Sequence, residues 1–368
     1  MAFQIARSDL IKPLQVVASA VERRQPLPIL SHILMTVKGQ MLSLTGTDLE
    51  VELVARIPLS SPAAEQQLTV PAKKMLDICK ALPDTSEITV ECDGDKITLK
   101  AGRSKYALTG LNPQEYPQFD EGPGALEFSL PPKKMRALLS QTSFAMAQQD
   151  VRYYLNGLLF WVKDNTIRAV ATDGHRLATR EIETKMMEGA EQQVIIPRKA
   201  VLELSRLLAE ESEELGVVLG EHHLRVITPR YSFSAKLIEG KFPDYKQVVP
   251  KGQAFEAIVN KDKFKEMLQR VSVLFSDKYR GISISFDSGT MQVKAKNQEQ
   301  EEAEEEIEIE YTGPERRIGF NCSYLLEYLA IVKSPMLKLR FSDPNASVLL
   351  EPASEEEGGL YVVMPMRL

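Results

Sequence analysis

The stretch VIIPRKAVLELSRLLAE, residues 194–210, opens as a short strand and continues as an amphipathic helix with apolar residues three and four positions apart. The same design recurs in LTVPAKKMLDICKALP, residues 68–83, and in IGFNCSYLLEYLAIV, residues 318–332. Aligned on the residue that precedes the helix motif, the three copies lie 126 and 124 residues apart. The chain therefore repeats a strand–helix unit at the length of a whole domain.

A second series of strand–helix units lies between these copies. It comprises FQIARSDLIKPLQVVASAVERR (3–24), EFSLPPKKMRALLSQTSFAMAQQ (127–149) and FEAIVNKDKFKEMLQRVSVLF (255–275), with periods of 125 and 129 residues. Solenoid repeats are only about 20–50 residues long. Two series with one long period therefore indicate three repeated domains, each with two helices.

Strand-like segments fill the rest of each repeat. LSLTGTDLEVELVARI (42–57), IRAVATDGHRLATREI (167–182) and MQVKAKNQEQEEAEEEIEIEY (291–311) occupy equivalent positions and partly alternate apolar with polar residues. Turn formers at 122–124 and 250–252 interrupt the pattern. We predict three strand-rich α+β domains, at 1–124, 125–252 and 253–368.

Composition excludes several classes of protein. The 368 residues contain no apolar run of about 18, and MAFQIARSDL carries charges where a signal peptide would be apolar. The three cysteines are odd in number and widely spaced, which fits a reducing cytoplasm better than a disulfide framework. There is no CxxC pair and there are only four histidines, so we expect neither a structural metal nor a cofactor.

The positive charge is concentrated in the helix-bearing segments. Segments 9–24, 71–82, 131–152, 197–208, 261–280 and 321–333 carry +11 together, which leaves −17 for the remainder of a chain whose net charge is −6. One explanation is that Lys and Arg are simply common in helices. The other is that the helices share a face toward a polyanion.

Two further segments have opposite charge. Residues 299–310 contain eight glutamates in twelve residues, whereas GRSKYALTG, residues 102–110, alternates basic with apolar residues. The acidic run could be a solvated edge, a divalent-metal site without the usual calcium-loop residues, or an edge that pairs with a basic partner. A head-to-tail contact between an acidic and a basic edge closes a ring if the rotation permits.

ATDGHRLAT, residues 171–179, is the one candidate for catalysis. Asp173 and His175 would share one face if this segment were a strand, and a hydrolase dyad or an enzyme that binds a small ligand could be built on them. However, the equivalent segments TGTDLE and KAKNQE contain no histidine, and no GxSxG, HExxH, Walker A or Rossmann motif occurs. A structural or binding role at a turn is therefore favoured.

Several motifs together resemble one family. The threefold repeat, LSLTGTDLEVEL, MAQQDVRYYLNG, VATDGHRLA, GKFPDY, NQEQEEAEE and the terminal YVVMPMRL are similar to the bacterial sliding clamps, the β subunits of DNA polymerase III, over essentially the whole chain. The resemblance implies a non-catalytic processivity factor: a head-to-tail homodimeric ring around double-stranded DNA, opened by a clamp loader. Its sheets would form the outer wall, and it would tether the replicative polymerase and other proteins that carry a clamp-binding motif.

The resemblance and the charge pattern together suggest which residues face DNA. A clamp that slides should contact phosphates and not base edges. The expected set is Arg24, Lys73, Lys74, Lys80, Lys133, Arg136, Arg198, Lys199 and Arg206 on or near the helices, with Gln149, Arg152, Tyr153 and Tyr154 in a loop. The two tyrosines could equally be core residues; on a strand they would face opposite ways, so that one is buried.

The resemblance also implies a groove between the second and third domains for a short partner peptide. The matching residues are Leu155, Thr172, Gly174, His175, Arg176, Leu177, Pro243, Val248, Val362, Val363, Met364, Pro365, Met366 and Arg367, with a neighbouring subsite at Asn321, Tyr324 and Ser347. Part of the terminal run could instead be a core strand. Gln247 stands where an Arg is usual in the family, which puts one polar contact in doubt.

The opposed edges give the expected dimer interface. Arg103, Lys105, Tyr106 and Leu108 of one copy should meet Val273, Leu274, Glu301, Glu302, Glu304 and Glu305 of the other. We expect the terminal strand to end at Val363 because Pro365 cannot donate a ladder hydrogen bond.

Overall fold

The computed structural model describes residues 2–21, 27–119, 122, 124–184, 191–252, 254–275, 280–354 and 358–367, except for the side chain of Ala125. Arg24, which was expected to face DNA, lies outside this part of the chain. The protein divides into two compact units, Met1–Lys133 with Leu202–Leu237 and Lys134–Val201 with Ile238–Leu368. We call these unit 1 and unit 2.

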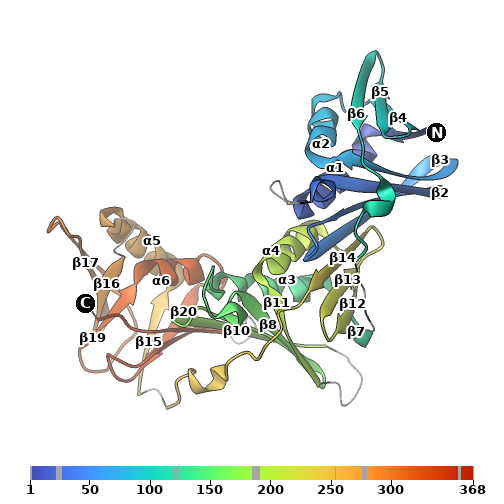
Figure 1. Ribbon diagram of the computed structural model, residues 1–368. Coiled ribbons are helices and arrows are strands. Elements are labelled where there is room, and N and C mark those ends of the chain that lie inside the picture. The colour runs from blue at the N-terminus through green and yellow to red at the C-terminus, as the bar shows by residue number, and fades with distance from the viewer. Residues whose placement is uncertain are drawn as a thin grey trace. The chain divides into compact units, whose positions relative to one another are not determined.

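Each of the six predicted strand–helix units is present, with a helix that begins within two residues of the end of a strand (Figure 1). The helices are α1 (Arg7–Ala20), α2 (Ala72–Ala81), α3 (Pro132–Ser140), α4 (Arg198–Leu207), α5 (Lys261–Val271) and α6 (Cys322–Leu329). Asn260 and Asn321 start the last two, because their side-chain oxygens accept from backbone N–H groups of the first turn. The division between the units falls within α3 and within α4.

The helices are shorter than the segments drawn from the sequence, most of all in 131–152. There α3 ends at Ser140, and two 3-10 turns follow at Ser143–Ala145 and Tyr153–Leu155. Thr142 Oγ1 donates to the carbonyl of Leu138 at 2.5 Å, which offers that carbonyl a side-chain partner at the point where the helix stops.

Unit 1 contains two antiparallel sheets. The first has the order β1 (Ala2–Ala6), β4 (Glu87–Asp93), β5 (Lys96–Ala101), β6 (Ser104–Thr109). The second has the order β2 (His32–Thr47), β3 (Val51–Pro71), β14 (Tyr231–Lys236), β13 (His223–Ile227), β12 (Leu215–Gly220), β7 (Gly124–Leu130). Helix α1 packs on α2, β2 and β3 through Leu10, Leu14 and Val17, whose spacing puts them on one face.

Unit 2 also contains two antiparallel sheets. The larger has the order β11 (Glu191–Pro197), β8 (Gly157–Lys163), β9 (Thr166–Thr172), β10 (Arg176–Glu183), β22 (Leu360–Val363), β21 (Val348–Pro352), β20 (Met336–Phe341), β15 (Phe255–Asn260). The smaller has the order β18 (Glu302–Glu308), β17 (Thr290–Lys296), β16 (Gly281–Asp287), β19 (Arg316–Asn321). Helices α5 and α6 pack against each other (Figure 1).

Neighbouring repeats are joined in the same way at both junctions. In unit 1, β3 of the first repeat pairs antiparallel with β14 of the second, with Leu53 opposite Phe233. In unit 2, β10 of the second repeat pairs antiparallel with β22 of the third, with Leu177 opposite Val362. Each joint therefore uses the strand after the Thr-Asp turn of one repeat and the last strand of the next.

Among the described residues, no helix is long and apolar enough to span a bilayer. In the same part of the chain, no group of His, Cys, Asp and Glu side chains is arranged to hold a metal ion.

Candidate functional site

A continuous apolar cluster covers one face of the larger sheet of unit 2. Val170, Leu177 and Val362 come from the three neighbouring strands β9, β10 and β22, and period-two alternation puts them on the same face. Within the described part of the chain, its buried members are Leu159, Val170, Leu177, Ile195, Phe242, Tyr245, Leu349 and Val362. Phe242 and Tyr245 come from the segment that follows Leu237, and they pack on this face of the sheet.

Three of the predicted groove residues, Leu177, Val248 and Val362, meet in this cluster, and Tyr154 packs against it. Leu155 is buried, but it is not part of the cluster. Pro243 is exposed, and so is Gln247, whose Nε2 donates to Asp244 Oδ2 at 3.0 Å. The partly buried Val248 and Tyr154 leave apolar surface at the rim of the cluster.

The turn favoured for Asp173 and His175 is present: these residues lie between β9 and β10. Asp173 Oδ1 accepts from the backbone N–H of His175 and Arg176 at 2.9 and 3.0 Å. Thr172 Oγ1 donates to the carbonyl of Arg176 and accepts from the N–H of Gly174. Gly174 has a φ of 89°, a conformation that favours glycine.

The first repeat builds the same turn without a histidine. Asp48 Oδ1 accepts from the backbone N–H of Glu50 and Val51, and Thr47 Oγ1 donates to the carbonyl of Val51. Leu49 takes the left-handed position with a φ of 77°. In both turns one carboxylate oxygen accepts from two backbone N–H groups, so the aspartate has a structural role, and His175 is exposed beside it.

Arg176 is the charged centre of the site. Its side chain is only 7% exposed, and its guanidinium lies 3.0 Å from Asp173 Oδ2 and 2.8 Å from Glu327 Oε2. It also donates to the carbonyl of Phe144 at 2.7 Å and stacks 4.4 Å from the ring of Tyr324. The predicted groove and its predicted subsite are thus linked through one buried cation.

The chain beyond β22 leaves the sheet as predicted, after Val363. The backbone N–H of Met364 donates to the carbonyl of His175 at 2.9 Å, and that of Met366 donates to Gly319 at 2.8 Å. Met364 and Pro365 are half-buried, whereas Met366 and Arg367 are exposed. The backbone of the two methionines is therefore held at the Thr-Asp turn and at β19.

The other two residues of the predicted subsite, Asn321 and Ser347, lie at the starts of α6 and β21. Asn321 uses its side-chain oxygen to accept from Ser323 N at 3.0 Å, as the cap of α6. Ser347 is half-buried immediately before β21.

The loop that was expected to contact DNA is a 3-10 turn at Tyr153–Leu155 and not a strand. Tyr153 is 58% exposed, and Tyr154 packs on the apolar cluster, so one tyrosine is indeed the more buried. Gln149 is exposed with a φ of 57°. Sequence reasoning missed Val151, which is 96% exposed; an apolar residue among polar neighbours was the available signal.

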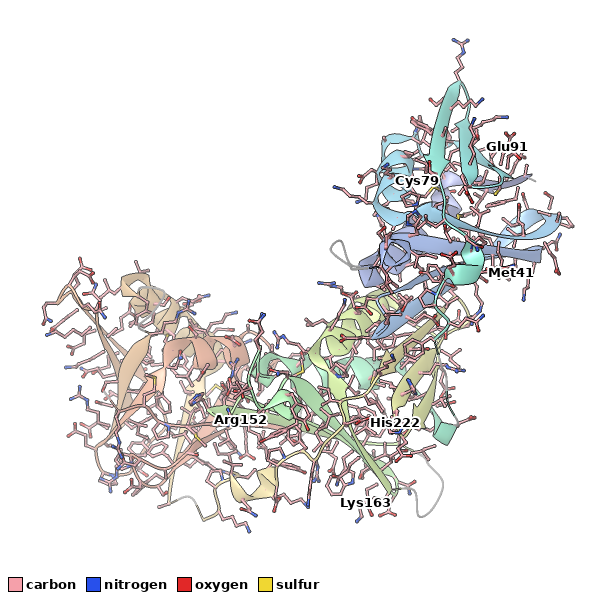
Figure 2. The ribbon with its side chains drawn as sticks, viewed as in Figure 1. Met41, Cys79, Glu91, Arg152, Lys163 and His222 are labelled. Atoms are coloured by element: carbon pink, nitrogen blue, oxygen red, sulfur yellow. The ribbon has the colours of Figure 1, made fainter. Side chains whose placement is uncertain are left out.

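Arg152, labelled in Figure 2, is not an unpaired cation. Its guanidinium makes two hydrogen bonds to the carboxylate of Asp150, at 3.0 and 2.8 Å. These bonds lower the pKa of Asp150 to about 2. The pair stays ionised at neutral pH, and the guanidinium of Arg152 is shared with a carboxylate of its own loop.

The predicted basic residues on the helices differ in how accessible they are. Lys73, Lys74 and Lys80 are exposed on α2, opposite the buried Met75 and Cys79. The remaining positions are the exposed Lys133 and Arg206 and the half-buried Arg136, Arg198 and Lys199.

Two of these arginines have partners within the chain. Arg198 donates to the carbonyl of Met146, and Arg206 pairs with Glu203 at 2.6 Å. The lysines of α2 therefore present the clearest basic surface.

The predicted acidic and basic segments are both sheet edges. Strand β6 ends the sheet β1-β4-β5-β6, and Arg103 is exposed in the turn before it, while Lys105, Tyr106 and Leu108 alternate along it. Strand β18 ends the sheet β18-β17-β16-β19. Each edge leaves a row of backbone groups without a strand partner.

The acidic edge already has partners within its own chain. Glu302 lies 2.7 Å from Lys296 and Glu304 lies 3.0 Å from Lys294, while Glu305 pairs with Arg270 on α5 and Glu301 accepts from Asn297. Close to this edge, Val273 is 81% exposed and Leu274 is half-buried. Because the glutamates of this edge are largely paired within the chain, the apolar Val273 and Leu274 are the more distinctive feature of this surface.

Comparison with known proteins matches the whole chain. The DNA polymerase III beta subunit family models match in order: the N-terminal domain at residues 1–120, the central domain at 129–244 and the C-terminal domain at 246–367. The chain is 49% identical to the beta sliding clamp of Pseudomonas aeruginosa and 40% identical to that of Escherichia coli, each over 100% of both chains. It is also similar to the solved sliding clamp of Pseudomonas aeruginosa bound to griselimycin, with 49% identity, full coverage of both chains and a TM-score of 0.97.

Proposed function

The chain belongs to the family of DNA polymerase III β subunits, the β sliding clamps, and on this premise we propose that two copies close head to tail into a ring around double-stranded DNA. The observation that carries the proposal is that three clamp domains fill the chain and are joined twice by one kind of strand pair. A third joint of that kind needs the edge strands β18 and β6, which lie at the two ends of the series. Each of these strands is the last strand of its sheet, so the partner for its open edge would come from a second copy.

The register of this third joint follows from the other two. Ala107 lies four residues after Arg103, the second residue of the turn between β5 and β6. Ser234 lies four residues after Arg230, the second residue of the turn between β13 and β14. Glu302 pairs with the last residue of the preceding strand, as Glu52 does. Because Ser234 pairs with Glu52, Ala107 should pair with Glu302 across the dimer interface.

In this register Lys105 stands opposite Glu304, two residues along. Opposite charges at directly opposed positions stabilise a strand pair by roughly 0.2–1 kcal/mol. Lys105 and Glu304 are both on the exposed side of their strands, and Tyr106 and Ala303 are both on the half-buried side. The faces of the two edges therefore agree, which supports the proposed pairing.

The exposed lysines of α2, with the other basic residues of the helices and the loop around Gln149, would contact the phosphates of DNA. Long, flexible side chains such as Lys73 and Lys80 attract the backbone without reading base edges. A ring that binds in this way is free to move along the duplex. We assign it a role in replication in the cytoplasm.

The apolar cluster with Arg176 and the terminal segment would form the groove for partner peptides from the clamp loader, the replicative polymerase and other clamp-binding proteins. Methionine and valine side chains give an adaptable apolar surface that can accept several related peptides. The relative that was solved with griselimycin supports a ligand-accepting surface on this fold. Two grooves per ring would raise the avidity for a bivalent partner.

We assign no chemical reaction to the protein. The Thr-Asp turn that could have served as an active site recurs at Thr47-Asp48 with the same backbone bonds and no histidine. The Asp173→Asn variant should therefore affect the turn and have no catalytic consequence.

Retention on circular DNA tests the proposed function. The purified protein, loaded by a clamp loader onto nicked circular DNA, should stay on the circle during gel filtration in high salt and leave when the circle is cut. Variants with Gln in place of Lys73, Lys74 and Lys80 should load more slowly while the dimer is unchanged. Release from intact circles as fast as from linear DNA, or strong selection of one DNA sequence, would contradict the proposal.

A further inference from the structure

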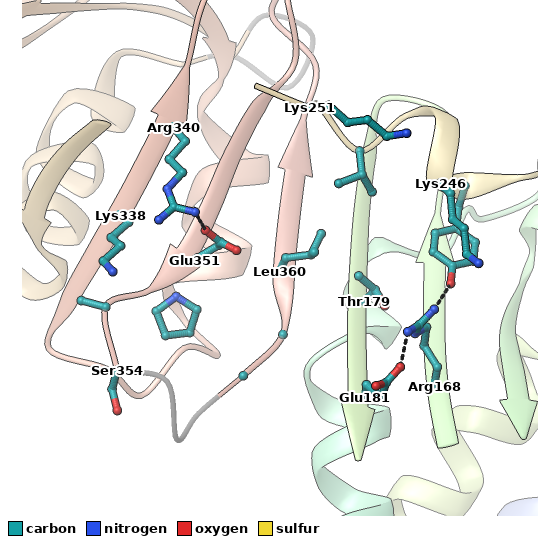
Figure 3. Close-up of a pocket in the computed structure, with 16 residues that line it drawn as sticks. Arg168, Thr179, Glu181, Lys246, Lys251, Lys338, Arg340, Glu351, Ser354 and Leu360 are labelled. Carbon is teal, nitrogen blue, oxygen red and sulfur yellow. Dashed lines mark hydrogen bonds and ion pairs between the residues drawn. The ribbon is translucent and has the colours of Figure 1, made fainter. Parts of the chain in front are cut away.

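A second, charged cleft lies on the same face of the larger sheet as the apolar cluster (Figure 3). It begins where β10 and β22 stop pairing, after Thr179 opposite Leu360. Its volume is about 650 Å³, within the range of roughly 300–1,000 Å³ that ligand pockets occupy. Nothing in the proposed sliding or groove function uses it.

Cations outnumber carboxylates among the described lining residues of this cleft. They include Arg168, Lys246, Lys251, Lys338 and Arg340, against Glu181 and Glu351. Residues 355–357, three glutamates in the sequence, lie outside the described part of the chain.

The two arginines are already held by carboxylates. Arg340 lies 2.9 Å from Glu351, and Arg168 pairs with Glu181 and donates to the hydroxyl of Tyr245 at 2.7 Å (Figure 3). Arg340 also lies 2.7 Å from Glu256. Their guanidinium groups are therefore fixed in position and already bind carboxylate oxygens.

The lysines are the available charges. Within the described part of the chain, Lys251 and Lys338 make no ion pair, and the ammonium of Lys246 lies 5.0 Å from the ring of Trp161. The surface between these lysines includes the apolar Val249 and Leu360. A ligand for this cleft should therefore carry negative charge on an extended, partly apolar chain.

The cleft continues directly from the apolar cluster. Tyr245 and Val249 belong to both. Thr179 lies two residues beyond Leu177 along β10 and faces the same way, which is a step of about 7 Å at the usual rise of a strand. A peptide in the groove would therefore need only a few more residues to reach the lysines.

We propose that this cleft binds acidic residues that flank the apolar motif of a partner peptide. The inference rests on the proposed function of the groove, which would hold the apolar motif and so bring its flanking residues to the cleft. Aspartate and glutamate side chains supply the carboxylates that Lys251 and Lys338 lack, and their aliphatic parts fit against Val249 and Leu360. A single phosphate would use the charges but not the apolar surface.

Peptide binding measured by calorimetry tests the proposal. Three peptides share one apolar clamp-binding motif and differ only in a flank of three glutamates on the N-terminal side, three on the C-terminal side, or three serines. One acidic flank should tighten binding about three- to tenfold at low salt, because exposed ion pairs contribute little individually and two of them act together. The gain should shrink to less than twofold in 0.5 M salt.

Two variants separate the cleft from general charge. K251Q/K338Q should bind the acidic-flank and serine-flank peptides equally, whereas K263Q/K265Q, which removes the same charge from α5, should keep the gain. Trp161 is the single tryptophan of the chain, and Lys246 and Arg168 lie over its ring. The acidic flank should therefore change its fluorescence in the wild type and in K263Q/K265Q, and less in K251Q/K338Q.

Each alternative result has a definite meaning. If the serine-flank peptide binds but neither acidic flank adds affinity, or if the gain survives in K251Q/K338Q, the cleft inference is wrong and the groove stands. If inorganic phosphate or a duplex oligonucleotide alone changes the fluorescence of Trp161 in the wild type but not in K251Q/K338Q, while the acidic flanks add nothing, the cleft binds another anion and the inference is wrong. If no motif peptide binds at all, the groove proposal fails and the inference fails with it.

Discussion

Arg176 shows how one side chain couples the fold to the site. Its guanidinium is almost completely buried and is shared between the carboxylates of Asp173 and Glu327. A buried cation is tolerated only when its charge is paired and hydrogen-bonded. The Thr-Asp turn, the start of β10 and helix α6 are held together by that requirement, and Tyr324 covers the group from the other side.

Replacing Arg176 with Gln should therefore destabilise unit 2. Removing one partner of a buried ion pair leaves Asp173 uncompensated, and we expect a loss of about 3 kcal/mol in the free energy of unfolding. Urea unfolding followed by the fluorescence of Trp161, which lies in β8 of unit 2, measures this directly. Arg152→Gln is the matched control, because its pair with Asp150 is exposed and should barely shift the midpoint. Equal midpoints for the two variants would show that Arg176 is not a structural ion.

Strand β22 joins strands of the second and third repeats into the larger sheet of unit 2. It is only four residues long, yet it lies between β10 of the second repeat and β21 of the third. Tyr361, Val362 and Val363 are fully buried, so the strand contributes apolar burial as well as two ladders of hydrogen bonds. The residues after it leave the sheet and carry the exposed methionine.

Two truncations should separate these roles. Ending the chain at Val363 removes the backbone bonds from Met364 and Met366, a loss of about 0.5–1.5 kcal/mol each, and should abolish binding of a motif peptide in a unit that still folds. Ending it at Gly359 removes β22 and should prevent cooperative folding of unit 2. Circular dichroism, Trp161 fluorescence and calorimetry distinguish the outcomes. Full peptide binding by the chain that ends at Val363 would place the partner site elsewhere.

For the molecule as a whole, the unused edges β6 and β18 matter most. The acidic edge satisfies much of its charge within its own chain through Lys294, Lys296 and Arg270. Salt bridges across the dimer interface would then contribute less than the composition of the run suggests. Burying the exposed Val273 should contribute more, on the order of 1–2 kcal/mol, together with the backbone bonds of the new strand pair.

The dimer prediction can be tested by mass and by cross-linking. V273D and R103E/K105E should each shift the protein toward monomer in light scattering, with V273D the stronger. In a C92S background, K105C/E304C should form a covalent dimer on oxidation, because the proposed register puts these residues directly opposite each other. K105C/E308C, displaced by four residues, should not. Cross-linking of the displaced pair, or an unchanged mass for both charge and valine variants, would refute the register or the interface.

The sequence by itself determined the repeated architecture of this protein. The spacing of apolar residues in the two series of repeats reflects the helical period, so all six strand–helix units could be located. The repeated α+β domains, and the clamp fold that the family resemblance implied, are confirmed. The end of β22 was also predictable, because the chemistry of Pro365 is local. The edge positions of β6 and β18 were suggested by charge alternating with apolar residues.

Only the tertiary structure decided how the site is built. A turn was favoured at Asp173, but its construction was not predictable: one carboxylate oxygen accepts from two backbone N–H groups, a geometry that alternation alone does not reveal. The pairing of Arg152 with Asp150, the burial of Arg176 and the cleft beside Lys338 each depend on residues far apart in the chain or on local geometry. Charge in a sequence is a sum over residues, but what a charge can bind depends on which partners the fold places within about 4 Å of it.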